Sequence, residues 1–185
     1  IANLKMYGNK KYVKSIKKVI DFKKKKKYAN AKLIYCPPYT LLGDFVNYTK
    51  NSSIDVGAQN CHQDEFSGSY TGSISSNMIK LLGAKYIIIG HSENRISGDN
   101  NSIINKKIIS SLSQKLNVIF CIGETFKEKK NNKTNLILNS QIIRGLKNIK
   151  KNNNIIFAYE PVWSIGTGVF PKNNELKIQI FAIKK

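Results

Sequence analysis

The segment Tyr86-Ile87-Ile88-Ile89-Gly90-His91-Ser92-Glu93 passes abruptly from an apolar run to a polar end. Four consecutive apolar residues without polar alternation are typical of a parallel strand that helices cover on both faces of the sheet. The run is far shorter than the roughly 18 apolar residues of a membrane span, and no other stretch approaches that length. The segment therefore predicts a buried strand of a globular α/β domain, followed by a polar loop.

The same pattern recurs about once every 31 residues along the 185-residue chain. Between the apolar runs lie stretches with helical spacing, near residues 13–20, 41–46, 103–112 and 137–143, and a further helix is expected to begin near Asn173. A (β/α)₈ barrel and a doubly wound sheet both show this alternation, so the spacing alone leaves both open. The predicted strands are residues 2–6, 32–36, 54–58, 86–90, 117–122 and 155–160.

The chain is strongly basic, with 31 Lys and Arg against 11 Asp and Glu and a formal net charge of +20. Only Arg95 and Arg144 are arginines, whereas nucleic-acid surfaces usually use Arg to contact base edges. We interpret the excess Lys as favouring solubility, and the run of residues 23–27 as the solvated end of a helix near the negative end of its dipole. An RNA-binding patch is the alternative. We expect no nucleic-acid partner and no membrane contact.

The three cysteines, Cys36, Cys61 and Cys121, lie far apart and lack the spacing of zinc ligands. Reduced thiols in a cytoplasmic enzyme are the simplest interpretation. The start of the chain shows no export signal. We therefore expect no metal and a cytoplasmic location.

Polar side chains of four types lie in or directly after three of the predicted strands. Asn3 and Lys5 are two apart in the first strand, so we expect them to point to one side of the sheet. His91 follows the fourth strand and Glu160 ends the sixth. A carboxylate, an imidazole and an ammonium at one rim suit removal of a proton next to a carbonyl. Each residue alone is more often structural, so the hypothesis depends on their convergence.

Five motifs occur in the order and spacing of one known family. They are Ala2-Asn3-Leu4-Lys5-Met6, Gly57-Ala58-Gln59-Asn60, Tyr70-Thr71-Gly72, Gly90-His91-Ser92-Glu93 and Ala158-Tyr159-Glu160-Pro161-Val162-Trp163-Ser164-Ile165-Gly166-Thr167-Gly168. Together, from residue 2 to at least residue 171, they resemble the triosephosphate isomerase family, and the last motif is nearly diagnostic.

The resemblance implies the roles of the catalytic groups, which are established for the family. Glu160 would be the base that moves a proton between two carbons of the substrate. His91 would be neutral, because a helix begins there, and would polarise the carbonyl oxygen. Lys5 would supply positive charge for the enediolate and phosphate, and Asn3 a further hydrogen bond. No metal or organic cofactor is implied.

The same resemblance implies a mobile lid and places Ser92 and Glu93 beside the catalytic groups. The amide of Gly166, within the lid, would bind the substrate phosphate, and lid closure would exclude water. Val169 stands where the family commonly has Lys at the trailing hinge, which bears on lid kinetics. The lid residues would be Pro161, Val162, Trp163, Ser164, Ile165, Gly166, Thr167 and Gly168.

A homodimer is also implied, because in the family the loop of residues 59–73 reaches a second subunit and places Thr71 beside its site. Ser73 replaces a usual Glu and Asn94 a usual Arg, two residues that pair across the family's interface. Losing both leaves no unpaired buried charge, so the interface is expected to persist with less specificity. An ordinary surface loop is the alternative.

The resemblance favours a (β/α)₈ barrel of which residues 1–185 form one incomplete domain, the first six βα units without the last two. The implied reaction interconverts dihydroxyacetone phosphate and D-glyceraldehyde 3-phosphate, a step of glycolysis and gluconeogenesis. We expect this stretch alone to be unstable or inactive, because six strands leave two open edges. Two alternatives remain: another phosphate-binding barrel enzyme such as an aldolase or epimerase, and an inactive fragment that binds nucleic acid non-specifically through its basic charge.

Overall fold

Six strands form one parallel sheet in the computed structural model, which describes residues 1–25, 28 and 30–184. Each strand pairs with the next one in sequence, so the order is β1 to β6 without reversal. A doubly wound sheet would reverse direction at a switch point, so the sequential order identifies the barrel-type alternative. The strands are β1 (Ala2–Asn3), β2 (Leu33–Cys36), β3 (Ile54–Ala58), β4 (Tyr86–Ile89), β5 (Asn117–Ile122) and β6 (Ile155–Tyr159).

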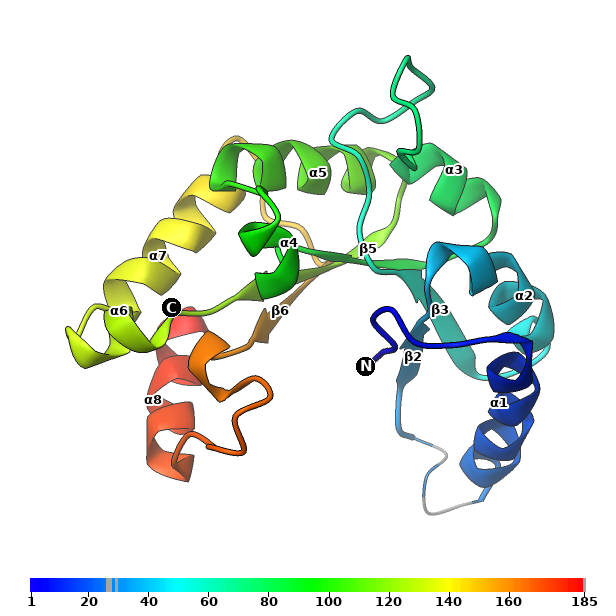
Figure 1. Cartoon of the computed structure of the whole chain (residues 1–185), viewed down its shortest axis with the longest axis horizontal. Coiled ribbons are helices and arrows are strands. Elements are labelled where there is room, and N and C mark those ends of the chain that lie inside the picture. Colours follow the sequence, from blue (N-terminus) through cyan, green and yellow to red (C-terminus); the bar gives the residue numbers. More distant parts are fainter. Residues whose placement is uncertain (26–27, 29, 185) are drawn as a thin grey trace.

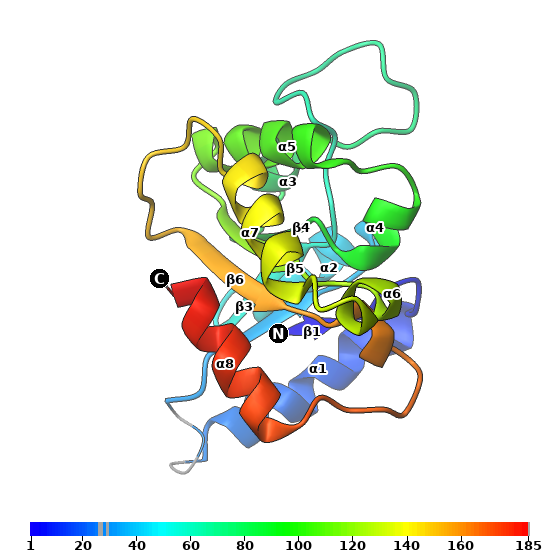
Figure 2. The same ribbon diagram turned by 90° about the vertical axis from the view of Figure 1, so that its left-hand side faces the viewer.

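The helices lie outside the curved sheet, and the whole forms an open arch whose two ends are the α1 and α8 sides (Figures 1 and 2). All the helices predicted from sequence spacing are present, whereas the short α3, α4 and α6 have too few turns to show a periodic pattern. No helix in the described part of the chain is long and apolar enough to cross a membrane. The helices are α1 (Lys10–Lys23), α2 (Tyr39–Thr49), α3 (Ser76–Leu81), α4 (Ser92–Ile96), α5 (Asn101–Ser113), α6 (Phe126–Lys130), α7 (Thr134–Gly145), the 3₁₀ helix η2 (Val162–Ser164) and α8 (Asn173–Lys184).

Strand β1 is shorter than the sequence predicts, because the chain leaves the extended conformation after Asn3. Lys5 has a φ of 49°, in the left-handed region, and the amide of Tyr7 closes a turn on the carbonyl of Leu4 at 3.0 Å. The expectation that Asn3 and Lys5 share one side of a strand by alternation was therefore wrong. A turn, rather than strand periodicity, sets the direction of Lys5.

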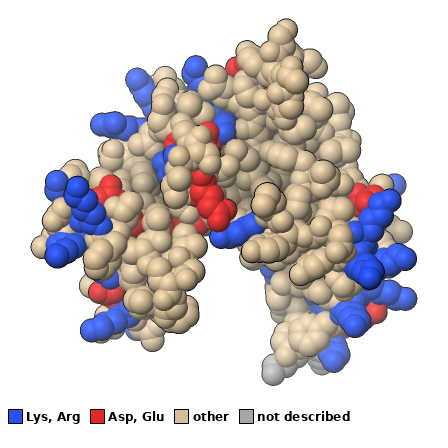
Figure 3. All heavy atoms as spheres, viewed as in Figure 1, with Lys and Arg blue, Asp and Glu red and all other residues tan. Residues whose placement is uncertain are grey.

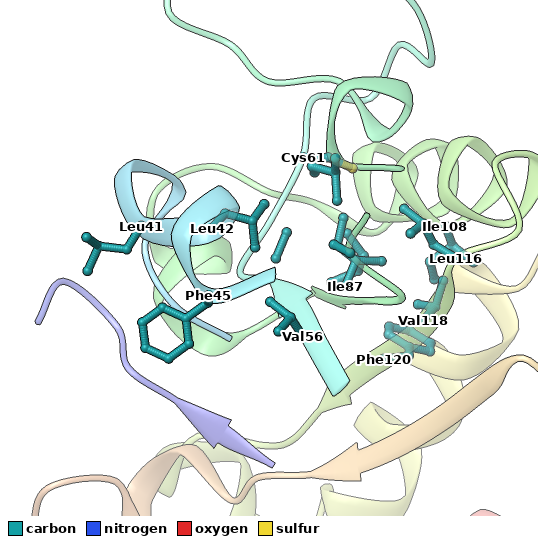
Figure 4. Close-up of a cluster of buried hydrophobic side chains, with 14 of the residues drawn as sticks. Leu41, Leu42, Phe45, Val56, Cys61, Ile87, Ile108, Leu116, Val118 and Phe120 are labelled. Carbon is teal, nitrogen blue, oxygen red and sulfur yellow. The ribbon is translucent and has the colours of Figure 1, made fainter. Parts of the chain in front are cut away.

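The sheet has an apolar face on each side, as the unbroken apolar runs predicted. On β4, Ile87 and Ile89 pack outward into the larger cluster with the helices, and Figure 4 shows Ile87 there among side chains of α2, α5 and β5. Tyr86 and Ile88 belong to a separate inner cluster, which also contains Cys36 and Cys121. Both faces of the central strands are thus covered, and strand alternation sorts residues between two cores.

The basic residues gather mainly over outer helices. Figure 3 shows Lys and Arg side chains on both flanks of this view, over α1 and over α6. Within the run of residues 23–27, Lys24 and Lys25 are exposed as predicted, but Lys23 is buried at 7% exposure. It continues the helical stripe of Val13 and Ile16, so its aliphatic stem packs inward. Residues 26 and 27 lie outside the described residues.

The last strand is much less covered than its neighbour. All but the first residue of β5 are buried, whereas Ile156 and Phe157 of β6 are 38% and 37% exposed. On α8, which follows, Ile178 and Phe181 are 60% and 63% exposed. In the described sheet, β1 and β6 each pair on one side only. The α8 end of the arch therefore presents apolar surface that its own elements leave uncovered.

Lys107 lies on the apolar stripe of α5, where its positive charge is paired with a carboxylate. Its ammonium donates to both carboxylate oxygens of Asp99 at 2.8 and 2.7 Å and to the side-chain oxygen of Asn60 at 3.1 Å. The Lys107 and Asp99 side chains are only 8% and 13% exposed. This ion pair fastens α5 to the segment after α4 and to the start of the β3–α3 loop.

Replacing Lys107 with Met is expected to lower the free energy of unfolding by about 3–5 kcal/mol, because the carboxylate of Asp99 would stay buried without a partner. Urea unfolding followed by circular dichroism measures this. Lys106→Met is the matched control, since the neighbouring Lys106 is exposed and its loss is expected to change stability by less than about 0.5 kcal/mol. Equal stability of the two variants would show that the buried ion pair has no net role.

Candidate active site

His91 and Glu160 meet at the carboxyl ends of β4 and β6. The imidazole Nε2 of His91 lies 3.3 Å from one carboxylate oxygen of Glu160, and the amide of Ser92 donates to the other at 2.8 Å. The imidazole Nδ1 accepts from the amide of Glu93 at 3.3 Å, at the start of α4. Since Nδ1 accepts, the proton of a neutral ring lies on Nε2 and points at Glu160. The geometry thus provides a hydrogen-bond donor and a carboxylate side by side.

Lys5 reaches the same place from β1. Its ammonium donates to Glu93 at 2.7 Å, and its backbone amide donates to the side-chain oxygen of Asn3 at 2.9 Å. The hydrogen bond from Lys5 lowers the pKa of the Glu93 carboxyl, against the smaller opposing effect of burial. These residues line a hollow of about 300 Å³ together with His91. A positive charge therefore stands across a small cavity from the imidazole.

Burial raises the pKa of Glu160 above its ordinary value, because the carboxylate loses water. His91, the amide of Ser92, Arg95 and Lys5 each oppose this shift. The Glu160 side chain is 21% exposed. A carboxylate with a raised pKa is a stronger base toward a C–H bond than one at its solution value.

Gln59, at the end of β3, holds the turn that carries Lys5. Its side-chain amide donates to the backbone carbonyl of Lys5 at 2.9 Å and to that of Cys36 at 2.8 Å. The sequence interpretation included Gln59 in a family motif and at the start of the projecting loop, and gave it no role in the candidate site. Its signal was a polar side chain directly after a buried strand, on the edge that carries the site.

The predicted lid follows Glu160 directly and is held at its base by Glu124, a 1% exposed residue after β5. The carboxylate of Glu124 accepts from the indole of Trp163 at 2.8 Å and from the hydroxyl of Tyr159 at 3.1 Å. The ammonium of Lys129 lies 3.6 Å from the centre of the Trp163 ring. The sequence analysis gave Glu124 no role and missed this contact.

The tip of the lid is exposed and built on glycines. Gly166 and Gly168 have φ values of 71° and 72°, a conformation that other residues rarely adopt. The hydroxyl of Thr167 donates to the carbonyls of Trp163 and Ser164 at 3.1 and 3.3 Å. The lid thus has internal order, and Gly166 lies outside the hydrogen-bond network that joins the catalytic groups in the described residues.

The loop between β3 and α3 projects beyond the helical layer (Figures 1 and 2). Thr71 is exposed on it, in a turn where Gly72 has a φ of 81°. At its base, the Tyr70 ring lies 4.1 Å from the His62 ring, centre to centre. Thr71 is not part of the cluster that contacts join among the described residues, which consists of Asn3, Lys5, His91, Ser92, Glu93 and Glu160.

The sequentially ordered parallel sheet and this cluster at its carboxyl edge define an isomerase of the β/α-barrel class. A family model described as "Triosephosphate isomerase" matches residues 1–185. The chain belongs to the triosephosphate isomerase family.

Similar proteins agree with this assignment. A protein named triosephosphate isomerase from Dictyoglomus thermophilum is 40% identical over 178 residues, which are 94% of this chain and 70% of that protein. One from Geotalea uraniireducens is 42% identical over 146 residues, 77% of this chain and 58% of that protein. A crystal structure of triosephosphate isomerase from Bartonella henselae superposes with a TM-score of 0.87 at 31% identity and covers 98% of this chain and 72% of that one. This chain thus spans 58% to 72% of these three proteins.

Proposed function

We propose that the chain carries the catalytic groups of an isomerase that interconverts dihydroxyacetone phosphate and D-glyceraldehyde 3-phosphate. The observation that supports this most strongly is the convergence of His91, Glu160 and Lys5 from three separate strands onto one rim. Family membership supports the same substrate pair.

In the proposed reaction the carboxylate of Glu160 removes a proton from the carbon next to the carbonyl. The electron pair moves to the carbonyl oxygen, where the Nε2 proton of His91 and the ammonium of Lys5 stabilise the negative charge. Return of the proton to the neighbouring carbon, with transfer of the hydroxyl proton between the two oxygens, gives the isomer. Atoms and charge balance without a cofactor.

Substrate entry requires Glu160 to change partners. In this structure its carboxylate accepts a hydrogen bond from the amide of Ser92 and contacts the imidazole of His91. A substrate between the imidazole and the base must separate the two, and the lid begins at the next residue, Pro161. We therefore propose that lid closure and repositioning of Glu160 occur together, with the amide of Gly166 meeting the phosphate and water excluded.

The test is a coupled isomerase assay combined with solvent exchange. The enediolate mechanism predicts that deuterium from D₂O enters dihydroxyacetone phosphate at the carbon that Glu160 deprotonates. A Schiff-base aldolase would instead be inactivated by borohydride in the presence of dihydroxyacetone phosphate. Steeply salt-dependent RNA binding without exchange would favour the nucleic-acid alternative and overturn the isomerase proposal.

We further propose a homodimer in which the projecting loop places Thr71 beside the partner's site. The exposure of Thr71 in a loop that extends from the molecule supports this. With Ser73 and Asn94 in place of a charged pair, we expect an interface governed more by shape than by charge. We also retain a cytoplasmic location and no nucleic-acid partner as proposals.

We propose that the architecture is one domain of the (β/α)₈ class, in which two further βα units would cover the exposed apolar residues of β6 and α8. The residues concerned include Phe157 and Phe181. Residues 1–185 alone are then expected to have little activity.

A further inference from the structure

Arg95, on α4, is a partly buried cation that the mechanism above does not use. Its guanidinium makes three hydrogen bonds: Nε to the carbonyl of Gly90 at 2.7 Å, Nη2 to the carbonyl of Cys121 at 3.1 Å and Nη1 to the side chain of Asn101 at 2.9 Å. Two of these acceptors are backbone groups at the carboxyl ends of neighbouring strands, β4 and β5. The planar fork of Arg can span such a pair of carbonyls, whereas an ammonium cannot match both directions at once.

The backbone at Gly90 is shaped around this guanidinium. Gly90 has a φ of 78°, and a Cβ atom there would lie 3.1 Å from Nη2 of Arg95 and 3.0 Å from the carbonyl oxygen of Cys121. A side chain at position 90 would therefore both strain the backbone and displace the guanidinium. The glycine leaves the space that Arg95 fills.

Each strand end that Arg95 holds leads directly to a catalytic residue. The carbonyl of Gly90 belongs to the peptide that precedes His91. The carbonyl of Cys121 precedes Ile122, whose own carbonyl accepts the backbone amide of Glu160 at 2.9 Å. The path from Arg95 to either catalytic residue is thus one or two peptide groups long, and it passes through backbone that has little freedom to relax.

The charge of Arg95 also acts on the catalytic carboxylate. The positive charge of Arg95 lowers the pKa of Glu160, as do His91, the Ser92 amide and Lys5, all against the larger effect of burial. Burial lowers the pKa of Arg95 itself, because the guanidinium loses part of its hydration. A charge in such a position acts over a longer range than one on the surface.

We propose that Arg95 is a positioning residue that sets the spacing between His91 and Glu160 and places a fixed positive charge behind the Glu160 carboxylate. It acts through the two strand ends and touches no reacting atom. Only the kinetic consequence of this role rests on the proposed isomerase function.

The first experiment is independent of catalysis. The amide of Ser92 donates to Glu160, so its ¹⁵N shift reports ionisation of that carboxylate during an NMR pH titration of the full chain, and Glu160→Gln identifies the signal. Arg95→Met is expected to raise the midpoint by about 0.5 pH unit or more, because the carboxylate loses a nearby opposite charge. Arg144→Met is the matched control, since Arg144 is exposed at the end of α7, and it should leave the midpoint unchanged.

The second variant separates charge from geometry. Arg95→Lys keeps the positive charge, so the midpoint of the Ser92 titration should stay near that of the unaltered chain. The lysine ammonium cannot bridge both carbonyls, so the geometry of the two strand ends should change. If the isomerase proposal holds, kcat should fall about tenfold with a smaller change in KM, because the base is displaced from its working position. Absence of isomerase activity in every variant of a chain extended by two further βα units, together with the midpoint shift in Arg95→Met, would refute the isomerase function and leave the role of Arg95 intact.

A purely structural role would give a different result. Arg95→Met and Arg95→Lys would then lose stability equally, with the Ser92 titration unmoved in both, and the proposal would be overturned. If Arg95→Met does not fold, Arg95→Gln supplies a polar, uncharged side chain about as long as Met. Comparison of its Ser92 titration midpoint with that of Arg95→Lys then distinguishes the positioning role from a purely structural one.

Discussion

In the chain extended by two further βα units, Glu160→Asp is expected to lower isomerase turnover by about 10²- to 10³-fold while changing KM by only a few-fold. Removal of one methylene withdraws the carboxylate from the reacting carbon, and a displacement of about 1 Å is enough to cost two orders of magnitude. The groups that would bind the phosphate and the carbonyl oxygen, including Lys5 and His91, are untouched. Steady-state kinetics in both directions measure kcat and KM separately.

The control for this variant is Glu128→Asp, the same chemical change in the capping box of α6, where the carboxylate pairs with Thr125 and not with the cluster around Glu160. It should leave turnover unchanged and cost stability only slightly. Turnover of Glu160→Asp equal to that of the unaltered chain would remove Glu160 as the base, whatever the effect on stability.

Addition of two further βα units is expected to raise kcat/KM by at least about 100-fold and to make thermal unfolding more cooperative. The added elements would pair with the free edges of β1 and β6 and cover Ile156, Phe157 and Ile178, each of which is more than a third exposed. Burial of such apolar surface contributes about 25 cal/mol per Å². A more rigid β6 would also hold Glu160 more firmly.

A chimera tests this second prediction. The last two units of the Dictyoglomus thermophilum protein, joined after residue 185, supply a related sequence, and a Gly/Ser extension of equal length is the control. Calorimetry and the isomerase assay are the measurements. An unextended chain with the same activity and the same sharp transition as the chimera would contradict the prediction.

The parallel strands and most of the site were predictable because they depend on short-range patterns. The runs at β3, β4 and β5 were located to within one residue, since an unbroken apolar stretch between helical segments has few other structural solutions. His91 and Glu160 were predictable because carboxyl ends of parallel strands share one edge. Ser92 and Glu93 followed from the same strand end.

Other features could not be predicted because their cause lies in distant parts of the chain. Lys5 leaves the strand in a left-handed conformation that Gln59, 54 residues away, holds by its carbonyl. Lys107 lies on the apolar stripe of α5, and no sequence pattern indicates that Asp99 is its ion-pair partner. Arg95 has no sequence signature either, because its acceptors are backbone carbonyls, which every residue possesses.

The sequence by itself determined the class of fold, the edge of the sheet that carries the candidate site and the polar side chains that gather there, because apolar runs and strand ends are properties of consecutive residues. The tertiary structure alone decided the order of the strands, the direction of Lys5 and the clamp that Arg95 makes across β4 and β5. These depend on which backbone groups approach one another after folding. That proximity comes from packing of the whole sheet, which no local pattern records.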